Sequence, residues 1–266
     1  MCEFCTKHGE GKRWYEVMEN YSKEMLEDPS RQKYIDHFIK NVRNNAEGNI
    51  KKLEWSKRRL PIAHRFIRKA ATANMKKYHF GQVVPLEDAK NIVHMVQSIT
   101  RIACVCRNVA TGKSNARYCL LLGIDPSESI KHWPELEASM ETLTPGEAEK
   151  LLDDFDREGL VHSIWTFKTP FIGAICNCGH DCLAYRIQVS SDLMNLMFKG
   201  EYTAHIDEAE CVGCRQCERI CPFSAVEYSS GSGSYYINPE KCYGCGVCRN
   251  VCKKDAISLV DKAVIR

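Results

Sequence analysis

Residues 211–228 read "CVGCRQCERICPFSAVEY", and residues 242–259 repeat their pattern as "CYGCGVCRNVCKKDAISL". Each half carries cysteines in the spacing C-x2-C-x2-C-x3-C. An iron–sulfur cube needs a thiolate at each iron corner, and three closely spaced cysteines hold corners of the same cube. The last cysteine of each half points away and reaches the other cube. The repeat therefore predicts two [4Fe-4S] clusters that exchange one ligand each.

This exchange assigns the eight cysteines to two groups. The first cluster takes Cys211, Cys214, Cys217 and Cys252. The second cluster takes Cys242, Cys245, Cys248 and Cys221. Zinc and disulfides are the alternatives for so many cysteines, but a zinc ion needs only four ligands and gives no reason for the same register to occur twice.

Over roughly residues 204–262 the sequence resembles a bacterial-type two-cluster ferredoxin. Pro222 follows the last cysteine of the first half as in that family, whereas Lys253 stands at the equivalent place in the second half. The resemblance implies hairpin strands and two short helices arranged around the clusters with pseudo-twofold symmetry. It also implies one-electron transfer as the chemistry of this part of the chain.

The whole chain has 266 residues, of which 16 are cysteines. Its first residues, "MCEFCTKHGEGKRWYEV", contain no apolar signal segment, so we expect a cytoplasmic protein. Cysteines in that compartment bind metal more often than they form disulfides. No run of apolar residues is long enough to span a membrane. Because exposed iron–sulfur cubes are oxidised by oxygen, the resemblance also implies an anaerobic cell.

Changes in composition and periodicity divide the chain into three parts. Residues 1–80 form a basic helical region with a net charge of +8, whereas the remainder carries −5. Residues 81–203 form an α+β domain that contains further cysteines, and residues 204–266 form the ferredoxin domain. The expected fold class is therefore α+β, with a mostly helical N-terminal part before the two-cluster domain.

Helical periodicity is clearest in three places. Trp14, Val17, Met18, Tyr21 and Met25 recur at helical spacing, with breaks expected at Pro29 and Pro61 and a turn at 46–49. A second helix begins near Leu86, and its apolar face continues to Ile99. In the third, Thr144, Pro145 and Glu147 predict a capped helix that Gly159 ends before a strand, "LVHSIWTF". This last order of elements is also that of a winged-helix-like part.

Six further cysteines lie between residues 104 and 182. They occur in "ACVCRNV", "RYCLLLG" and "ICNCGHDC", each beside the start or end of an expected element: Cys104, Cys106, Cys119, Cys176, Cys178 and Cys182. Residues 100–185 resemble a group of ferredoxin-domain proteins from anaerobes. The resemblance rests on the segments Cys104–Arg107, Cys119–Gly123, Gly159–His162 and Cys176–Cys182.

These six cysteines predict a third iron–sulfur cluster. Zinc is the rival, since thiolate-rich tetrahedral sites suit both metals, and plain buried thiols are the remaining alternative. Six candidates exceed four ligand positions, so either at least one is free or two metals are present.

Cys2, Cys5 and His8 have metal-like spacing, but the terminus supplies only half of a site. We expect Cys2 and Cys5 to bind metal together with cysteines from the second domain. The alternative is a frayed terminus with two solvent-facing thiols.

The sequence as a whole indicates an electron-transfer protein or subunit that exchanges single electrons with a partner oxidoreductase. One alternative is a reductase with an open iron–sulfur site in the 104–182 region. Another is a redox-sensing regulator that binds DNA, but its candidate recognition helix, "EAEKLLDDFDRE" at 147–158, is acidic and would repel phosphate, so nucleic acid is disfavoured. The basic stretch 51–77 is a solvated face or a docking surface for an acidic redox partner, ahead of anionic membrane or nucleic acid.

Overall fold

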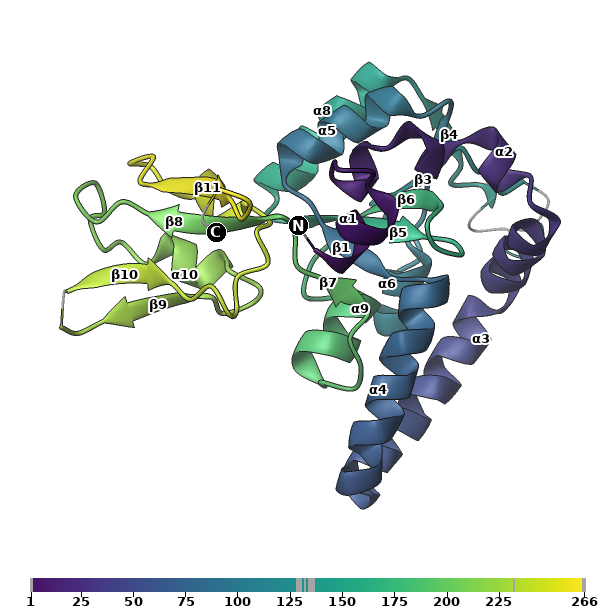
Figure 1. Ribbon diagram of the computed structural model, residues 1–266, viewed down its shortest axis with the longest axis horizontal. Helices are drawn as coiled ribbons and strands as arrows, with labels where there is room; N and C mark the ends of the chain where they lie inside the picture. The colour runs from purple at the N-terminus through teal and green to yellow at the C-terminus, as the bar shows by residue number, and fades with distance from the viewer. Residues whose placement is uncertain (1, 128–130, 132, 134–136, 232, 265–266) are drawn as a thin grey trace.

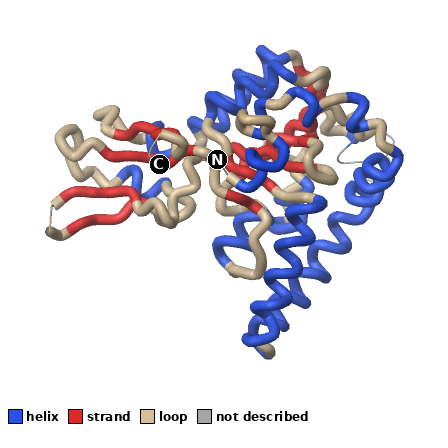
Figure 2. The backbone as a smooth tube through the Cα atoms, in the orientation of Figure 1, coloured by secondary structure: helices blue, strands red, loops and turns tan. Residues whose placement is uncertain are grey.

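The computed structural model describes residues 2–127, 131, 133, 137–231 and 233–264, without the side chains of residues 43 and 44. The α+β fold is confirmed. Figure 1 shows a larger body of helices around a sheet and a smaller C-terminal body of short strands and helices beside it. The colouring in Figure 2 shows that the long helices belong to the larger body.

The larger body is built on a seven-stranded sheet with the strand order β4-β2-β3-β6-β5-β1-β7. Neighbouring strands are antiparallel except β1 and β7, which run parallel. The strands are β1 (Gly81–Val83), β2 (Ile99–Ile102), β3 (Cys119–Leu122), β4 (Glu141–Leu143), β5 (Val161–Thr166), β6 (Ile172–Cys178) and β7 (Met197–Phe198).

Helices cover both faces of this sheet. The helical elements are α1 (Glu3–His8), η1 (Trp14–Glu16), η2 (Met18–Tyr21), α2 (Lys23–Leu26), α3 (Pro29–Arg59), α4 (Pro61–Tyr78), α5 (Leu86–Met95), α6 (Val105–Thr111), α8 (Pro145–Arg157), α9 (Leu183–Tyr185) and a π-helical turn, η3 (Arg186–Ser190). One hydrophobic cluster joins α1, η1, α5 and α8 to the sheet, and a second joins α3, α6 and α9 to it. Strand alternation sends Leu120 into the first cluster and Leu121 into the second.

The breaks at Pro29 and Pro61 are confirmed, because each proline begins a helix. The turn expected at 46–49 is wrong, since α3 runs through it. A glycine inside a helix costs only about 1 kcal/mol relative to alanine. The buried side chains of Ile39 and Ile50, on either side of Gly48, offset that cost by packing into the core. The helices α3 and α4 therefore form one long hairpin that extends away from the sheet (Figure 1).

Residues 13–26 do not form the regular helix that their spacing indicated. They form two 3-10 turns and the short helix α2, because Val17 and Ser22 adopt extended backbone conformations. Trp14, Tyr15 and Tyr21 are nevertheless buried. The segment thus covers one face of the sheet as an irregular layer.

The helix that begins at Leu86 is confirmed, but it ends at Met95, and Ile99 starts the strand β2. The capping box of α8 is also confirmed: Thr144 and Glu147 bond reciprocally, and Gly159 follows the helix with φ of 81°. The helix, glycine turn and strand of a winged-helix-like part are all present. They continue into the seven-stranded sheet.

The smaller body repeats itself along the chain. It contains β8 (Tyr202–Ile206), α10 (Gln216–Ile220), β9 (Val226–Ser229), β10 (Ser234–Ile237), α11 (Val247–Asn250) and β11 (Ile257–Asp261). β8 pairs with β11, and β9 pairs with β10, all antiparallel. Left-handed backbone occurs at Gly213, Arg215 and Ser224, and again 31 residues later at Gly244, Gly246 and Asp255. The two cysteine-rich halves therefore share one local fold.

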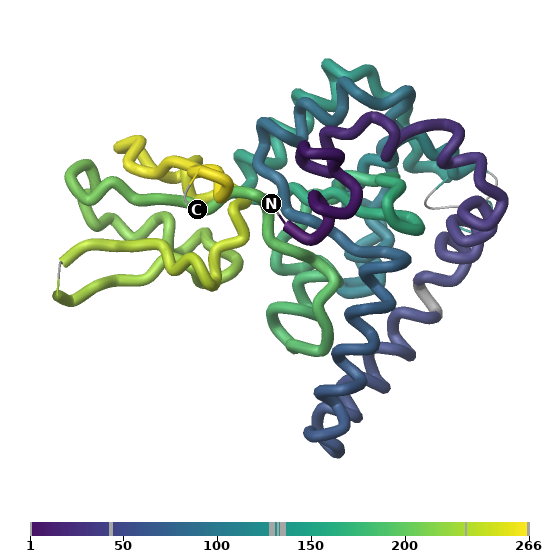
Figure 3. Tube along the Cα trace, in the orientation of Figure 1, coloured from purple at the N-terminus to yellow at the C-terminus, as the bar shows by residue number. Residues whose placement is uncertain are grey.

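Several contacts hold the two bodies together. Arg249 donates hydrogen bonds from its two terminal guanidinium nitrogens to the Glu87 carboxylate, at 2.8 and 3.0 Å. Asn250 donates to the Asp156 carbonyl at 2.8 Å. Figure 3 follows the chain, in green, from the larger body into the smaller one. The division at residues 80 and 203 stays a prediction, and residues 1–80 share both hydrophobic clusters with residues 81–203.

Candidate metal centres

The smaller body contains two cavities, each lined by four cysteines. The outer cavity is lined by Cys211, Cys214, Cys217 and Cys252. Left-handed backbone at Gly213 and Arg215 curls the chain so that successive cysteines face inward. Apolar side chains such as Ile206 and Ile257 line part of its wall, and Arg215, Lys253 and Lys254 line another part. This donor set and lining fit an iron–sulfur cube.

The inner cavity is lined by Cys221, Cys242, Cys245 and Cys248. Backbone amides point at its sulfurs: the Ala225 N–H donates to Cys221 Sγ at 3.3 Å, and the Ala204 N–H donates to Cys242 Sγ at 3.4 Å. Such bonds stabilise thiolates over thiols. Burial raises the pKa of Cys248 to about 12, so this sulfur ionises more readily beside a positive group. A cationic iron–sulfur group therefore fits this cavity too.

A third group of cysteines gathers on one face of the seven-stranded sheet. Cys119 begins β3 and pairs directly with Cys176 of β6. Cys178 lies two residues after Cys176 and so on the same face. The other three come from α6, from the residue before α6 and from the residue before α9. We call the group the central cysteines, which all line one cavity: Cys104, Cys106, Cys119, Cys176, Cys178 and Cys182.

The central cysteines lie close together in pairs. The sulfurs of Cys178 and Cys182 are 3.1 Å apart, and those of Cys104 and Cys119 are 3.4 Å apart. Among the described residues, no three of these sulfurs lie within 4.8 Å of one another. A tetrahedral zinc site brings its sulfurs to about 3.8 Å from one another. The six sulfurs therefore do not gather around one point as the donors of a single-ion site do.

Two donors stabilise a thiolate at Cys104. The Tyr118 N–H donates to its sulfur at 3.1 Å, and the buried Arg107 guanidinium donates at 3.7 Å. Arg107 is held in place by Asp181 at 2.8 Å and by the Asn177 carbonyl at 3.2 Å. A fixed positive charge therefore lies beside the central cysteines, at the residue that follows the C-x-C segment.

The thiols of this group differ in acidity. Hydrogen bonding with Cys119 and burial raise the pKa of Cys104, and burial raises the pKa of Cys106. Cys182 differs, because hydrogen bonding with Cys178 lowers its pKa to about 7.

An apolar cavity opens beside the central cysteines. Its wall includes Phe38 of α3 and Trp165 of β5. Two of the central cysteines, Cys106 and Cys176, also line it. His79 lines both this cavity and that of the central cysteines. Burial lowers the pKa of His79 to about 4, so its ring is neutral. No sequence signal predicts this placement, because residue 79 lies between elements and far from any cysteine in the chain.

The central cysteines and the inner cavity share one core. Cys245 belongs to the same hydrophobic cluster as Cys178 and Cys182. Cys221 packs against this cluster and against the core of the smaller body. Burial and the nearby Cys221 raise the pKa of Tyr185, three residues after Cys182. Packed side chains thus connect the outer cavity, the inner cavity and the central cysteines in that order.

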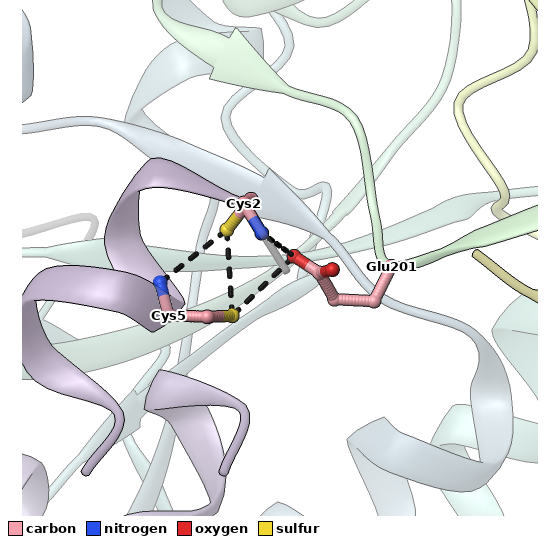
Figure 4. Close-up of side chains that lie close together, drawn as sticks. All are labelled: Cys2, Cys5 and Glu201. Atoms are coloured by element: carbon pink, nitrogen blue, oxygen red, sulfur yellow. Dashed lines mark hydrogen bonds between the residues drawn. The ribbon is translucent and has the colours of Figure 1, made fainter. Parts of the chain in front are cut away.

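The N-terminal pair, Cys2 and Cys5, lies beside a carboxylate (Figure 4). The two sulfurs are 3.4 Å apart, and Cys5 Sγ is 3.4 Å from Glu201 Oε1. The partner from beyond residue 80 is thus a glutamate and not a cysteine. Sequence reasoning missed Glu201, since a lone glutamate before "YTAHID" carries no metal-binding signal. Burial alone would raise the pKa of Glu201, but hydrogen bonds from Cys2, Cys5 and Gln82 lower it.

The basic stretch 51–77 comprises the last part of α3 and nearly all of α4. Trp55, Leu60, Ile62 and Phe66 are exposed there among the lysines and arginines. No helix in the described part of the chain is sufficiently long and apolar to cross a bilayer.

Comparison with known proteins identifies only the C-terminal part. Residues 198–259 match a family model described as a 4Fe-4S dicluster domain. The search of curated proteins found no match for this chain. The C-terminal part of the chain is therefore a 4Fe-4S dicluster domain, which supports an iron–sulfur electron-transfer role.

Proposed function

We propose that the protein passes single electrons between a partner oxidoreductase and a third cluster held by the central cysteines. The observation that carries this proposal is the shared core in which Cys245, Cys221 and Tyr185 connect the inner cavity to Cys182. A protein that used only the two clusters of the smaller body to exchange electrons with partners in solution would not need this contact. The function is therefore a relay that ends inside the larger body.

The cavities support the ligand sets that we propose. The outer one is Cys211, Cys214, Cys217 and Cys252, and the inner one is Cys221, Cys242, Cys245 and Cys248. The third uses four of the central cysteines. When bound, [4Fe-4S] groups accept and release one electron each. The chain supplies the thiolates, the amides that bond to them and an apolar wall that limits water.

The outer cavity is the end that meets the partner. Cys214 and Val212 are exposed at its rim, whereas the inner cysteines Cys242, Cys245 and Cys248 are buried. Arg215, Lys253 and Lys254 line the same cavity and are exposed. Arg215 is paired with Glu218 at 3.0 Å, so Lys253 and Lys254 supply the positive charge of the rim, which suits an acidic redox partner. We propose an anaerobic cytoplasm as the setting, because a cube at an exposed rim is open to oxygen.

Anaerobic optical spectroscopy of the full chain tests the proposal. Dithionite is expected to bleach the broad visible absorbance of the iron–sulfur groups, and a mild oxidant is expected to restore it. Cys214→Ala and Cys245→Ala each remove a ligand of a different cavity and should lose part of the reversible signal and the transfer of electrons to an added acceptor. Full electron transfer in both variants would contradict the ligand assignment.

A second candidate is a reductase with an open iron site among the central cysteines. The apolar cavity that reaches Cys106 and Cys176 favours it, because a small apolar substrate would fit there. The substitution Phe38→Trp narrows this cavity without touching a cysteine. If the protein is a reductase, this variant should lose turnover of small electron acceptors while keeping its iron and its bleaching by dithionite.

A further inference from the structure

The N-terminal cysteine pair and Glu201 form a compact group of donor atoms. The sulfur of Cys2, the sulfur of Cys5 and a carboxylate oxygen of Glu201 all lie within 4.8 Å of one another. The two sulfurs are 3.4 Å apart, and the sulfur of Cys5 is also 3.4 Å from the carboxylate oxygen. Ligands about 2.3 Å from a tetrahedral zinc ion lie about 3.8 Å from one another. The three donor atoms, which Figure 4 shows facing one another, are therefore spaced closely enough to bind a single ion.

The carboxylate of this group forms no ion pair within the described ranges. The Glu201 side chain is buried, with 5% of the residue exposed. Lys262 is near enough to interact electrostatically with Glu201 and Cys2, but its ammonium donates to the Gly200 carbonyl at 2.7 Å. A buried carboxylate is stable when it is paired with a cation or coordinates a metal. The adjacent thiols would add negative charge on ionising, so the site as a whole calls for a cation.

Gln82 orients two of the three donors. Its side-chain amide donates to Glu201 Oε1 at 3.3 Å and lies 3.6 Å from Cys2 Sγ. The amide is itself fixed, because its oxygen accepts a hydrogen bond from Trp14 Nε1 and its nitrogen also donates to the Lys199 carbonyl at 3.2 Å. Gln82 is completely buried. Outer groups of this kind hold metal ligands in position.

The remaining side of the group is open. A cavity lined by Cys2, Gln82, Met197 and Tyr243 reaches Cys2 from outside. Water can enter there and complete the coordination of an ion held by three protein ligands.

We infer that Cys2, Cys5 and Glu201 bind one zinc ion, with water in the fourth position. Thiolates favour zinc over calcium or magnesium, which prefer oxygen ligands. The spacing suits a single ion, unlike that of the other cysteines. Binding releases the two thiol protons to solvent. Because Glu201 lies between β7 and β8, the ion fastens the start of the chain to the segment that joins the two bodies.

Elemental analysis of the full chain, prepared anaerobically with zinc chloride and freed of loose metal, tests this inference. About one zinc per chain is expected in addition to iron. Cys5→Ser should raise the dissociation constant for zinc by more than about 100-fold, since the loss of an outer partner alone costs 10- to 100-fold. Glu201→Gln should weaken binding in the same direction, and the iron and sulfide contents should not change.

Glu10→Gln provides the matched control, because Glu10 is an exposed carboxylate of the same terminal segment. It should keep the zinc. Zinc-edge X-ray absorption on the unaltered protein should show two sulfur neighbours and needs no variant to fold. Iron-replete protein without zinc, zinc retained by Cys5→Ser, or a disulfide between Cys2 and Cys5 would each overturn the inference. None of these results bears on the relay, because the iron content reports on that separately.

Discussion

At the scale of single residues, Arg107 has the clearest role beyond that of the cysteines. It is buried, it lies 3.7 Å from the sulfur of Cys104, and Asp181 and the Asn177 carbonyl fix its guanidinium. A positive charge beside a cluster stabilises the reduced form, which carries one more electron than the oxidised form. Arg107 should therefore raise the reduction potential of the proposed third cluster.

The substitution Arg107→Met keeps much of the buried volume and removes the charge and the N–H donor. We expect the reduction potential of one cluster to fall, while the potentials of the other two stay unchanged. A redox titration followed by electron paramagnetic resonance measures each potential. Asp181→Asn is the companion variant, and because it removes a negative charge it should shift the same potential upward. Equal shifts in all clusters, or none, would place Arg107 away from a cluster.

At the scale of elements, the two halves of the dicluster domain offer equivalent positions with different surroundings. Gly213 and Gly244 both have left-handed backbone, with φ of 66° and 71°. A Cβ at Gly213 would meet nothing within 4 Å, whereas a Cβ at Gly244 would lie 2.2 Å from the Tyr202 carbonyl oxygen. Only the second turn packs against a strand, so the repeat is symmetric in backbone and asymmetric in packing.

Alanine at these two positions should therefore act differently. Gly213→Ala is expected to cost about 1 to 2 kcal/mol through the left-handed backbone alone. Gly244→Ala adds a steric clash and should cost about 3 to 5 kcal/mol in total. Thermal unfolding under anaerobic conditions, followed by far-UV circular dichroism and by loss of visible absorbance, compares them. Equal losses in the two variants would show that the close approach to β8 does not matter.

The same elements show what the sequence could predict. The spacing of the cysteines and the capping box at Thr144 are local signals, and both led to correct elements. The chain through Gly48 stayed helical because Ile39 and Ile50 pack into a distant core, which no local rule reports. The positions of Glu201 and His79 beside cysteines could not be predicted for the same reason, because the residues that they contact lie far away in the chain. Local chemistry identified candidate ligands, and tertiary contacts determined which of them meet.

At the scale of the whole molecule, the order of the sites predicts which clusters lose their supply of electrons when one site is removed. The inner cavity lies between the exposed outer cavity and the central cysteines, with Cys245 packed against the core that holds Cys182. Breaking the inner site should isolate the larger body from electrons that arrive through the outer cavity.

Cys245→Ala tests that order. We expect a protein-sized acidic donor, such as a reduced acidic ferredoxin, to reduce the outer cluster but to reduce the third cluster far more slowly. Dithionite, which is small, should still reduce the third cluster. Freeze-quenched electron paramagnetic resonance follows each cluster separately, and Glu10→Gln, at an exposed residue away from the cysteine-lined cavities, serves as the control. Unchanged reduction of the third cluster by the protein donor would rule out a relay through the inner cavity.

The central claim is that this chain holds three iron–sulfur clusters, two in the dicluster domain and one on the central cysteines. Iron and acid-labile sulfide per chain, measured on anaerobically prepared full-length protein, test it most directly. The account predicts about twelve of each, four for every cube. About eight of each would contradict the third cluster, and colourless protein without iron would contradict the account as a whole.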